Sequence, residues 1–418
     1  RRGAYRLGAL SLFGTLAADA DCTEWLDRVG GSWRPAQSIC DPRGRQVAAL
    51  WRDEDGSVFL PFDPNEVIHN YWSERYRELS ERTFVARLRT LARHSYYRVR
   101  PVLPRGAQLR MRRSFSRLQA RTRFPRWPIE TALHDLYRFL LDLLTEIAPA
   151  PIPMIAPWPR GSSWALVLTH DVEGPVGYRN LRQLLEIEMS SGYRSSWNFV
   201  PRRGYDVDES LVEELHDGGF EIGVHGLYHD GRDVDSATLR DRLPYMRAYA
   251  ERWGATGFRS PATIRSWELI PQLGFEFDSS YTDTAPFEPQ PGGCCTWLPY
   301  MIEDVVELPI TLTQDHTLFE VLREPDERAW LDKTAFLREQ GGMALMVTHP
   351  DYIGNHTLLR SYSRFLDAFA DDETAWRAVP GQVSAWWRRR GASELRHVAG
   401  NWSVIGPARE DAVVELVS

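Results

Sequence analysis

The residues Trp164–Gly174, which read WALVLTHDVEG, place two carboxylates directly after an apolar run. The run Trp164–Leu168 predicts a buried strand. Because side chains alternate along a strand, Asp171 and Glu173 are expected on one face and His170 on the other. Two carboxylates at the carboxyl end of a buried strand lie where α/β proteins place their catalytic groups. A solvated strand end with scattered acids is the ordinary alternative for such a pair alone.

Further polar residues follow the later apolar runs. His225 and His229, in the segment HGLYH, are four residues apart, so in a helical turn both imidazoles can reach one metal ion. A chance pair of packed histidines is the alternative for this spacing alone. Arg259 and Asp278 lie at the ends of two further predicted strands, and His349 follows a third. In a barrel all strand ends meet at one mouth, so these residues together predict one site for metal binding, proton transfer and charge orientation.

Strand and helix patterns that would position these residues alternate from about residue 160 onward. Helix-length segments lie between most of the strands, and their ends carry stop signals at Gly218-Gly219 and Gly254. Alternation at this spacing predicts an α/β fold with a parallel sheet, open or closed into a barrel, and seven such units fit a slightly incomplete (β/α) barrel best. The predicted strands are Trp164–Thr169, Ser196–Val200, Phe220–Val224, Thr256–Arg259, Phe275–Ser279, Val305–Ile310 and Ala344–Thr348.

The composition also divides the chain. The segment Ala148–Pro159, APAPIPMIAPWP, excludes a regular helix and is interpreted as a linker. We therefore expect an N-terminal α+β and helical region over 1–150, a barrel over 160–390 and a C-terminal β tail over 391–418. Within the first region, Asn65–Leu91 and Ile129–Ile147 show helical patterns.

Charge limits the partners that the protein can have. A net charge of -7 over 418 residues argues against a dedicated nucleic-acid binder. The stretch Arg82–Arg126, however, has fourteen arginines and no acidic residue, and its segment Ala107–Gln119 is predicted to be helical. Such a stretch can bind an acidic glycan, a lipid phosphate or a membrane surface, or it can be a solvated face that pairs with acids elsewhere.

Targeting and redox signals are few. Arg1-Arg2 followed by an apolar run resembles a signal peptide, but we interpret this start as the first strand of a small domain. A cytoplasmic protein is expected, with secretion as the alternative. No run approaches the roughly 20 apolar residues of a membrane helix. Cys294 and Cys295 are interpreted as ordinary thiols, because four cysteines make no disulfide framework in a chain of this length.

Five segments, in this order, resemble the polysaccharide deacetylases of carbohydrate esterase family four. The resemblance covers about residues 160–390 and implies a distorted barrel and a metal-dependent hydrolase that removes an acyl group, usually acetyl, from an amino sugar. A saccharide or polysaccharide is then the substrate. The segments are THDVE at 169–173, HGLYH at 225–229, RSP at 259–261, FDSS at 277–280 and THP at 348–350.

The resemblance also implies a role for each matching residue. Asp171 matches the catalytic base and Arg259 the arginine that steadies this base. His349 matches the general acid, and Asp278 the carboxylate that tunes the acid. The two histidines of HGLYH match metal ligands. Asp315, His316 and His356 are left without a role.

The first two motifs depart from the family pattern. Val172 stands where the family usually has a metal-binding aspartate, and Gly226 stands where Ser or Thr is usual. Strand alternation and the longer side chain make Glu173 the predicted third ligand, with His170 packed or hydrogen-bonded on the other face. One divalent ion is expected because the predicted ligand atoms are nitrogen and oxygen. Zinc is the expected ion, with nickel and cobalt as alternatives.

Two other functions stay open at this point. One is hydrolysis of another C–N amide bond on a small molecule, and the other is a non-catalytic glycan-binding or scaffold protein with a degenerate site. Aromatic residues near the strand ends can line a glycan cleft, although packing in the core is the usual role of such rings. They are Trp197, Tyr228, Trp267, Tyr281, Trp297 and Tyr352.

Overall fold

The chain forms two large and two small sheets in this computed structural model, which describes residues 1–80, 110–114, 124–354, 356–398 and 400–418. The first large sheet comes from residues 2–59 and the second from residues 164–377. Most of the arginine-rich stretch Arg82–Arg126, including most of the helix predicted over Ala107–Gln119, lies outside the described residues.

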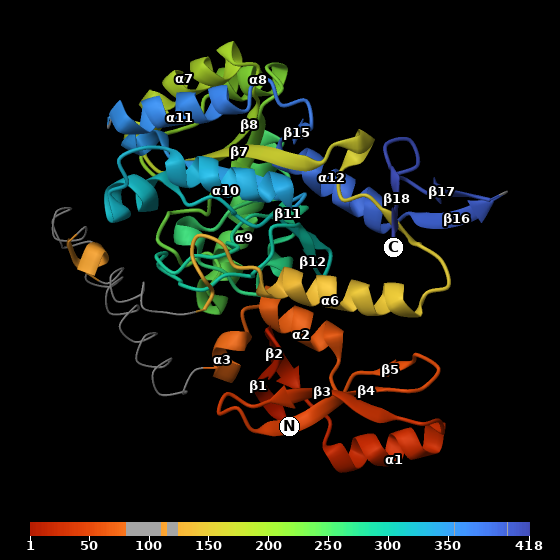
Figure 1. The fold of residues 1–418 in the computed structure, drawn as a ribbon. Coiled ribbons are helices and arrows are strands. Elements are labelled where there is room, and N and C mark those ends of the chain that lie inside the picture. The colour runs from red at the N-terminus through yellow and green to blue at the C-terminus, as the bar shows by residue number, and fades with distance from the viewer. Residues whose placement is uncertain (81–109, 115–123, 355, 399) are drawn as a thin grey trace.

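The first large sheet is antiparallel, with the strand order β2-β1-β3-β4-β5. The start of the chain is a strand, as predicted. Helices α2 and α6 lie between this sheet and the second one (Figure 1), and Leu133 and Leu136 of α6 are fully buried there. The elements are β1 (Arg2–Leu7), β2 (Leu10–Thr15), α1 (Asp19–Val29), β3 (Arg34–Cys40), β4 (Gln46–Arg52), β5 (Val58–Phe59), α2 (Pro64–Trp72), α3 (Tyr76–Ser80) and α6 (Ala132–Ile147).

The second large sheet is a distorted, incomplete (β/α) barrel, as the sequence predicted. Its order is β12-β13-β11-β10-β9-β8-β7-β14, with β15 paired to β7, and all pairings except β12 with β13 are parallel. All seven predicted strands are present. The strands are β7 (Trp164–Val172), β8 (Ser195–Phe199), β9 (Glu221–Val224), β10 (Gly257–Phe258), β11 (Phe277–Asp278), β12 (Tyr300–Ile302), β13 (Val305–Glu307), β14 (Met343–Thr348) and β15 (Ala375–Arg377).

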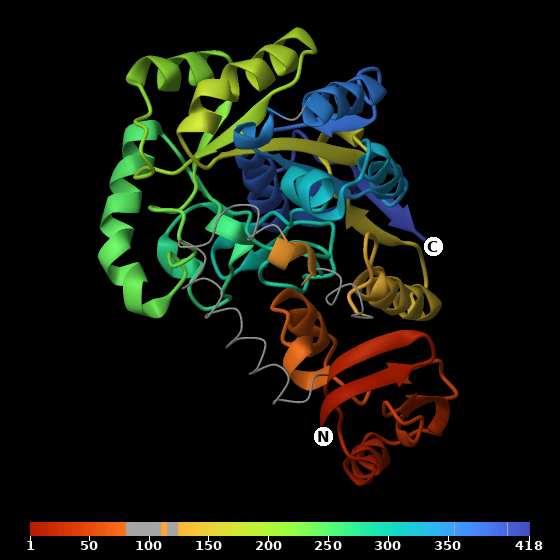
Figure 2. The ribbon, with the colours of Figure 1, turned by 90° about the vertical axis from the view of Figure 1, so that its left-hand side faces the viewer.

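Helices cover the outer side of the barrel sheet (Figure 2). The predicted stop signals hold: α8 ends at Gly218, and α9 ends at Gly254, whose φ of 62° is the left-handed value that glycine adopts without strain. The α-helices are α7 (Pro175–Ser190), α8 (Glu209–Asp217), α9 (Ser236–Trp253), α10 (Arg328–Glu339), α11 (His356–Ala368) and α12 (Pro380–Gly391). The remaining helical segments are the 3₁₀ helices η2 (Pro159–Gly161), η3 (Pro261–Thr263), η4 (Pro271–Leu273) and η6 (Pro350–Tyr352) and the π-helix η5 (His316–Leu322).

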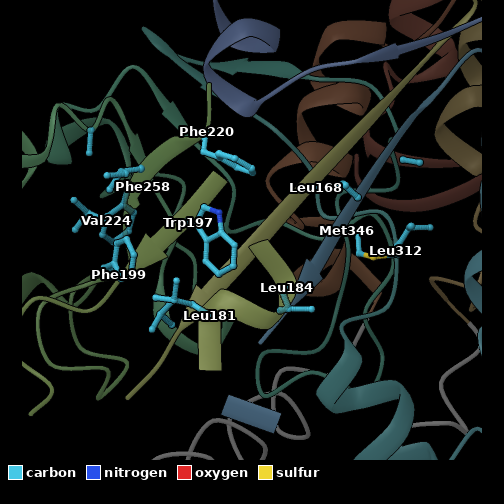
Figure 3. Close-up of a cluster of buried hydrophobic side chains, with 14 of the residues drawn as sticks. Leu168, Leu181, Leu184, Trp197, Phe199, Phe220, Val224, Phe258, Leu312 and Met346 are labelled. Atoms are coloured by element: carbon cyan, nitrogen blue, oxygen red, sulfur yellow. The ribbon is translucent and has the colours of Figure 1, made fainter. Parts of the chain in front are cut away.

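The core fills the space between these helices and the strands. In Figure 3, Leu181 and Leu184 of α7 lie with Leu168 of β7 and Trp197 of β8, and all four are at most 2% exposed. Burying a side chain of this size contributes about 1.5–3 kcal/mol. The core therefore fixes β7 and β8 against α7, and with them the residues at the carboxyl ends of these strands.

The sheet ends at β12 and β14, and the chain after β13 spans the space between β13 and β14. Leu312 donates a backbone hydrogen bond to the carbonyl oxygen of Leu345 in β14 at 3.0 Å, and Thr311 Oγ1 donates to that of Met343 at 2.8 Å. The segment after β13 therefore lies beside β14 without forming a full strand.

The C-terminal part forms the two small sheets, as the alternating tail predicted. The segment Ala148–Pro159 is more than a linker, because its strand β6 pairs with β18. Within the described residues, no helix is both long enough and apolar enough to cross a bilayer. The strands are β6 (Ile152–Ile155), β16 (Glu394–Val398), β17 (Asn401–Ile405) and β18 (Val414–Val417).

Candidate metal centre

Glu173, His225 and His229 form a cluster at the mouth of the barrel, with ligand atoms that all lie within 4.8 Å of one another. Glu173 follows β7 directly, and the histidines follow β9. Glu173 Oε1 lies 2.8 Å from His229 Nε2. The chain turns sharply between the two histidines: φ is +66° at Gly226 and +56° at His229. The structure therefore brings together the three residues that the sequence predicted as ligands.

The hydrogen bonds of His225 prepare it to bind a cation. Its Nδ1 lies 3.0 Å from the carbonyl oxygen of Arg259, which can only accept, so Nδ1 carries the proton and Nε2 holds a lone pair. Burial lowers the pKa of His225 to about 4, which keeps the ring neutral near pH 7. Among the described residues, this buried Nε2 has no hydrogen-bond partner. A buried lone pair beside a carboxylate and a second imidazole fits a divalent cation such as zinc.

Asp171 lies at the same mouth, held through one of its two oxygens. Oδ1 accepts hydrogen bonds from Arg259 Nη1 at 3.0 Å and from Asn198 Nδ2 at 2.9 Å. Oδ2 points the other way, 3.8 Å from His225 Nε2 and 4.0 Å from His349 Nε2. Burial alone would raise the pKa of Asp171, but the neighbouring His225 and Arg259 lower it to about 2. The carboxylate is therefore ionised with one oxygen free to act.

His349, directly after β14, lies on the opposite side of Asp171 Oδ2 from Arg259. Its Nδ1 is 2.5 Å from Asp315 Oδ1, and its backbone N–H donates to Asp315 Oδ2 at 2.8 Å. Burial alone would lower the pKa of His349, but the carboxylate of Asp315 raises it to about 10. His349 is therefore protonated near pH 7, with Nε2–H directed toward the cluster.

The carboxylate beside His349 is Asp315, and the prediction of Asp278 for this position was wrong. Asp278 ends β11, which is separated from β14 by four strands in the sheet order, and it lies across from Glu307 of β13. Its carboxylate accepts hydrogen bonds from the backbone N–H and the hydroxyl of Ser280, both at 2.9 Å. Burial raises the pKa of both Asp278 and Glu307. Asp315 reaches His349 because the chain after β13 lies beside β14.

His170 faces away from the cluster, as strand alternation predicted. Its Nδ1 lies 2.7 Å from Thr348 Oγ1, and its Nε2 lies 2.8 Å from Glu188 Oε1 of α7. His170 and Glu188 are both fully buried. Both ring nitrogens thus contact protein groups, Thr348 and Glu188, on the side away from the cluster.

Sequence reasoning did not predict that two residues, Asp351 and Tyr352, contact Glu173. Tyr352 donates its hydroxyl to Glu173 Oε2 at 2.9 Å. Asp351 Oδ2 accepts the backbone N–H of Glu173 at 2.8 Å, and its Oδ1 accepts that of Gly177 at 3.1 Å. A Cβ on Gly177 would lie only 2.1 Å from Asp351, so glycine is required for this close approach. The Asp-Tyr pair directly after the THP segment was the available signal, since it follows a strand end of the mouth.

Gly226 departs from the family pattern for a steric reason. A Cβ there would lie 2.4 Å from Asp233 Oδ2 and 2.7 Å from Pro261, and the positive φ strains any other residue. Asp233 is fully buried and accepts a hydrogen bond from Arg242 at 3.0 Å. A serine or threonine side chain is therefore excluded in this arrangement, and the carboxylate of Asp233 fills the space.

The aromatic candidates divide into buried and exposed rings. Trp197, Tyr281 and Trp297 are at most 4% exposed and belong to the core. Tyr352 contacts Glu173 as described above. Tyr228, next to His229, is 38% exposed.

The chain matches no protein-family model and no curated protein in sequence. Among solved structures it is similar to a probable polysaccharide deacetylase from Pseudomonas aeruginosa, at 18% identity and a TM-score of 0.45, over 64% of this chain and 98% of that one. It is also similar to PuuE allantoinase, at 16% identity and a TM-score of 0.46, with the same coverage of 64% and 98%. A third is the peptidoglycan deacetylase PdaC from Bacillus subtilis, at 13% identity and a TM-score of 0.36, over 55% of this chain and 94% of that one. The chain is similar in fold, at low identity, to polysaccharide deacetylases, the proteins that its five motifs resemble.

Proposed function

We propose that this protein is a metal-dependent hydrolase that removes an N-acyl group from an amino sugar or a polysaccharide. Acetyl is the acyl group that we propose. The observation that carries the proposal is the convergence of three states at the mouth of the barrel. The ionised carboxylate is that of Asp171. Its Oδ2 lies 3.8 Å from Nε2 of the neutral His225, which holds a lone pair, and 4.0 Å from Nε2 of the protonated His349. These groups can supply a metal ligand, a general base and a general acid, which together suit metal-assisted hydrolysis of an amide.

Glu173, His225 and His229 are the residues that would hold the metal ion. A bound divalent cation lowers the pKa of water and polarises the acyl carbonyl. Glu173 is suited to the task because burial alone would raise its pKa, whereas His229 and the other histidines hold it well below its usual range. Zinc fits this ligand set, as do nickel and cobalt.

The two proton transfers follow from the hydrogen bonds of the chain itself. Asp171 has Oδ1 fixed by Arg259 and Asn198, so Oδ2 is the atom that accepts the proton of the attacking water. The water oxygen bonds to the acyl carbon while the carbonyl π bond opens, and the C–N bond breaks only as the amine nitrogen receives a proton. His349 Nε2 then donates its proton to the leaving amine nitrogen, while Asp315 stabilises the imidazolium through Nδ1. The products are the carboxylic acid and the free amine.

The substrate class rests on the resemblance and on one feature of the mouth. The five motifs resemble those of enzymes that act on acylated amino sugars. Tyr228, next to His229, is 38% exposed and adds an aromatic side chain at the edge of the mouth that a sugar can contact.

Acetate release from N-acetylglucosamine oligomers by the zinc-loaded protein tests the proposal. We expect Asp171→Asn to lower kcat by roughly a hundredfold or more without loss of fold, because the base is removed. The exposed Asp217→Asn, at the end of α8, is the matched control and should retain turnover. Near-wild-type turnover of Asp171→Asn, or no metal bound after reconstitution by elemental analysis, contradicts the mechanism. Release of an acyl or ureido group from small amides alone would move the function to small-molecule C–N hydrolysis.

A further inference from the structure

The loop after β8, residues 201–205, forms part of the rim of the metal centre. In the sheet, β8 lies between β7 and β9, the two strands that carry the predicted ligands. On one side of the loop, the Tyr205 hydroxyl donates to the carbonyl oxygen of Val172 at 2.7 Å, just before the glutamate ligand. On the other side, the backbone N–H of Arg202 donates to the carbonyl oxygen of Leu227 at 3.1 Å, between the two histidine ligands.

This loop exposes two neighbouring guanidinium groups, those of Arg202 and Arg203. Arg202 Nη1 donates to the Tyr228 hydroxyl at 2.9 Å, and its guanidinium carbon lies 4.2 Å from the ring centroid of Tyr245 in α9. Arg203 Nη1 donates to the carbonyl oxygen of Tyr228 at 3.3 Å. Within the part of the chain that the structure describes, neither guanidinium forms an ion pair with a carboxylate. These contacts hold two positive charges beside the residue that precedes His229.

A third arginine near the Tyr228 ring, Arg242, differs in this respect. The Arg242 guanidinium carbon lies 5.1 Å from that ring centroid, and the group pairs with Asp230 at 2.6 Å and with Asp233 at 3.0 Å. Its charge is therefore balanced within the protein. The charges of the two loop arginines are left for a ligand.

We propose that Arg202 and Arg203 form an anion subsite that binds a carboxylate on the saccharide, next to the acylated amino sugar. The substrate class is then an acidic N-acylated saccharide that contains a uronate-type sugar. Guanidinium groups bind carboxylates through paired, charge-assisted hydrogen bonds. Tyr228 and Tyr245, which are 38% and 49% exposed, hold the guanidinium of Arg202 at the rim, the first through its hydroxyl and the second through its ring. This inference rests on the proposed function, because it names the substrate class for that site.

Calorimetric titration of the zinc-loaded, full-length Asp171→Asn protein tests the subsite without turnover. The probes are a hyaluronan tetrasaccharide, which alternates glucuronate with N-acetylglucosamine, the neutral N-acetylglucosamine tetramer, and N-acetylglucosamine 1-phosphate. At low salt we expect at least about tenfold tighter binding of the hyaluronan tetrasaccharide than of the neutral tetramer, and a smaller preference at high salt because exposed charges are screened. A preference for the phosphate probe over the hyaluronan tetrasaccharide would overturn the assignment of a carboxylate.

Replacement of both loop arginines, in R202Q/R203Q, should bring the affinities for acidic and neutral tetramers to within about twofold of each other. Arg396→Gln is the matched control, because Arg396 is also exposed and lies on β16 in the C-terminal hairpin. It should keep the full preference. Equal binding of the two tetramers by the unsubstituted loop, or a preference that survives in R202Q/R203Q, would overturn the subsite.

Acetate release by the protein with Asp171 intact separates this inference from the proposed function. If acetate is released from both tetramers at equal efficiency and R202Q/R203Q changes neither, the subsite is wrong and the hydrolase stands. If the tetrasaccharide binds in an arginine-dependent way but no acetate is released from any probe, the anion subsite stands and the proposed hydrolase is wrong.

Discussion

Two buried histidines at strand ends of the same barrel, His170 and His225, differ in the surroundings of their ring nitrogens. His170, near the end of β7, has Thr348 Oγ1 at 2.7 Å from one nitrogen and Glu188 Oε1 at 2.8 Å from the other. His225, after β9, has a partner for Nδ1 only, and among the described residues its Nε2 has none. Both ring nitrogens of His170 therefore have protein partners, whereas Nε2 of His225 is left available to a bound ion.

This comparison shows that residue types alone do not tell whether a buried polar cluster is structural or can bind an ion. The polar atoms that lack a hydrogen-bond partner are the better guide. Both clusters contain histidine and glutamate. Glu188 accepts hydrogen bonds from Tyr362 and from Ser195 Oγ, the latter at 2.6 Å, so the cluster behind β7 is closed by protein donors. A closed buried network specifies packing, whereas an open one at the mouth of a barrel fits a bound ion.

The largest expected effects test the difference between the cluster at the mouth, which contains Glu173, and the cluster behind β7, which contains His170. Glu173→Ala should lower zinc affinity by more than about a hundredfold, because loss of outer partners alone costs 10–100-fold and Glu173 is a proposed ligand of the ion itself. His170→Ala should keep its zinc but lose about 3 kcal/mol of stability, because it removes one partner of the buried Glu188. Metal stoichiometry and urea denaturation measure the two quantities. Loss of zinc in His170→Ala together with wild-type zinc affinity in Glu173→Ala would reverse the assignment of the two faces.

A smaller effect concerns the carboxylate that sets the protonation of His349. Asp315 raises the pKa of His349 to about 10, so the acid is present below that pH and activity falls as pH rises through it. Asp315→Asn removes the main cause, and we expect the alkaline limb of kcat against pH to move down by about one to three units. Asp278→Asn, a buried aspartate at another strand end, is the control whose limb should stay in place.

The stability that the His349–Asp315 pair contributes should fall with rising pH, as the activity does. The pKa of His349 is raised on folding, so its pair with Asp315 stabilises the protein fully below about pH 6.5, the usual value for histidine, and loses this contribution as pH rises toward 10. Asp315→Asn should therefore lower stability most near pH 6 and least above pH 10. An alkaline limb that moves in Asp278→Asn and not in Asp315→Asn would restore the role first predicted for Asp278.

The smallest effect concerns the hydroxyl that fixes the glutamate ligand. Tyr352→Phe removes the 2.9 Å hydrogen bond to Glu173 Oε2, and we expect about tenfold weaker zinc binding in a chelator competition. Tyr205→Phe is the matched control, because its hydroxyl donates to a backbone oxygen, that of Val172, at 2.7 Å. Equal losses of zinc affinity in both variants would mean that Tyr352 acts only through general packing.

The sequence by itself determined the strands, the helix ends and the sides on which residues lie. These features depend on local periodicity, so Asp171 and Glu173 were assigned to one face of β7 and His170 to the other before any fold was known. Gly254 marked the end of α9 because glycine adopts a left-handed φ at low cost. The order of the five motifs, read as a resemblance, then indicated which strand ends meet.

Only the tertiary structure decided which side chains touch across the mouth. Asp315 reaches His349 because the irregular chain after β13 crosses to β14, which no local pattern shows. Tyr352 reaches Glu173 from 179 residues away, and Asp278 pairs with Glu307 because β11 and β13 are neighbours in the sheet. Such contacts depend on strand order and on the curl of the sheet, whereas a sequence pattern carries only the spacing along the chain.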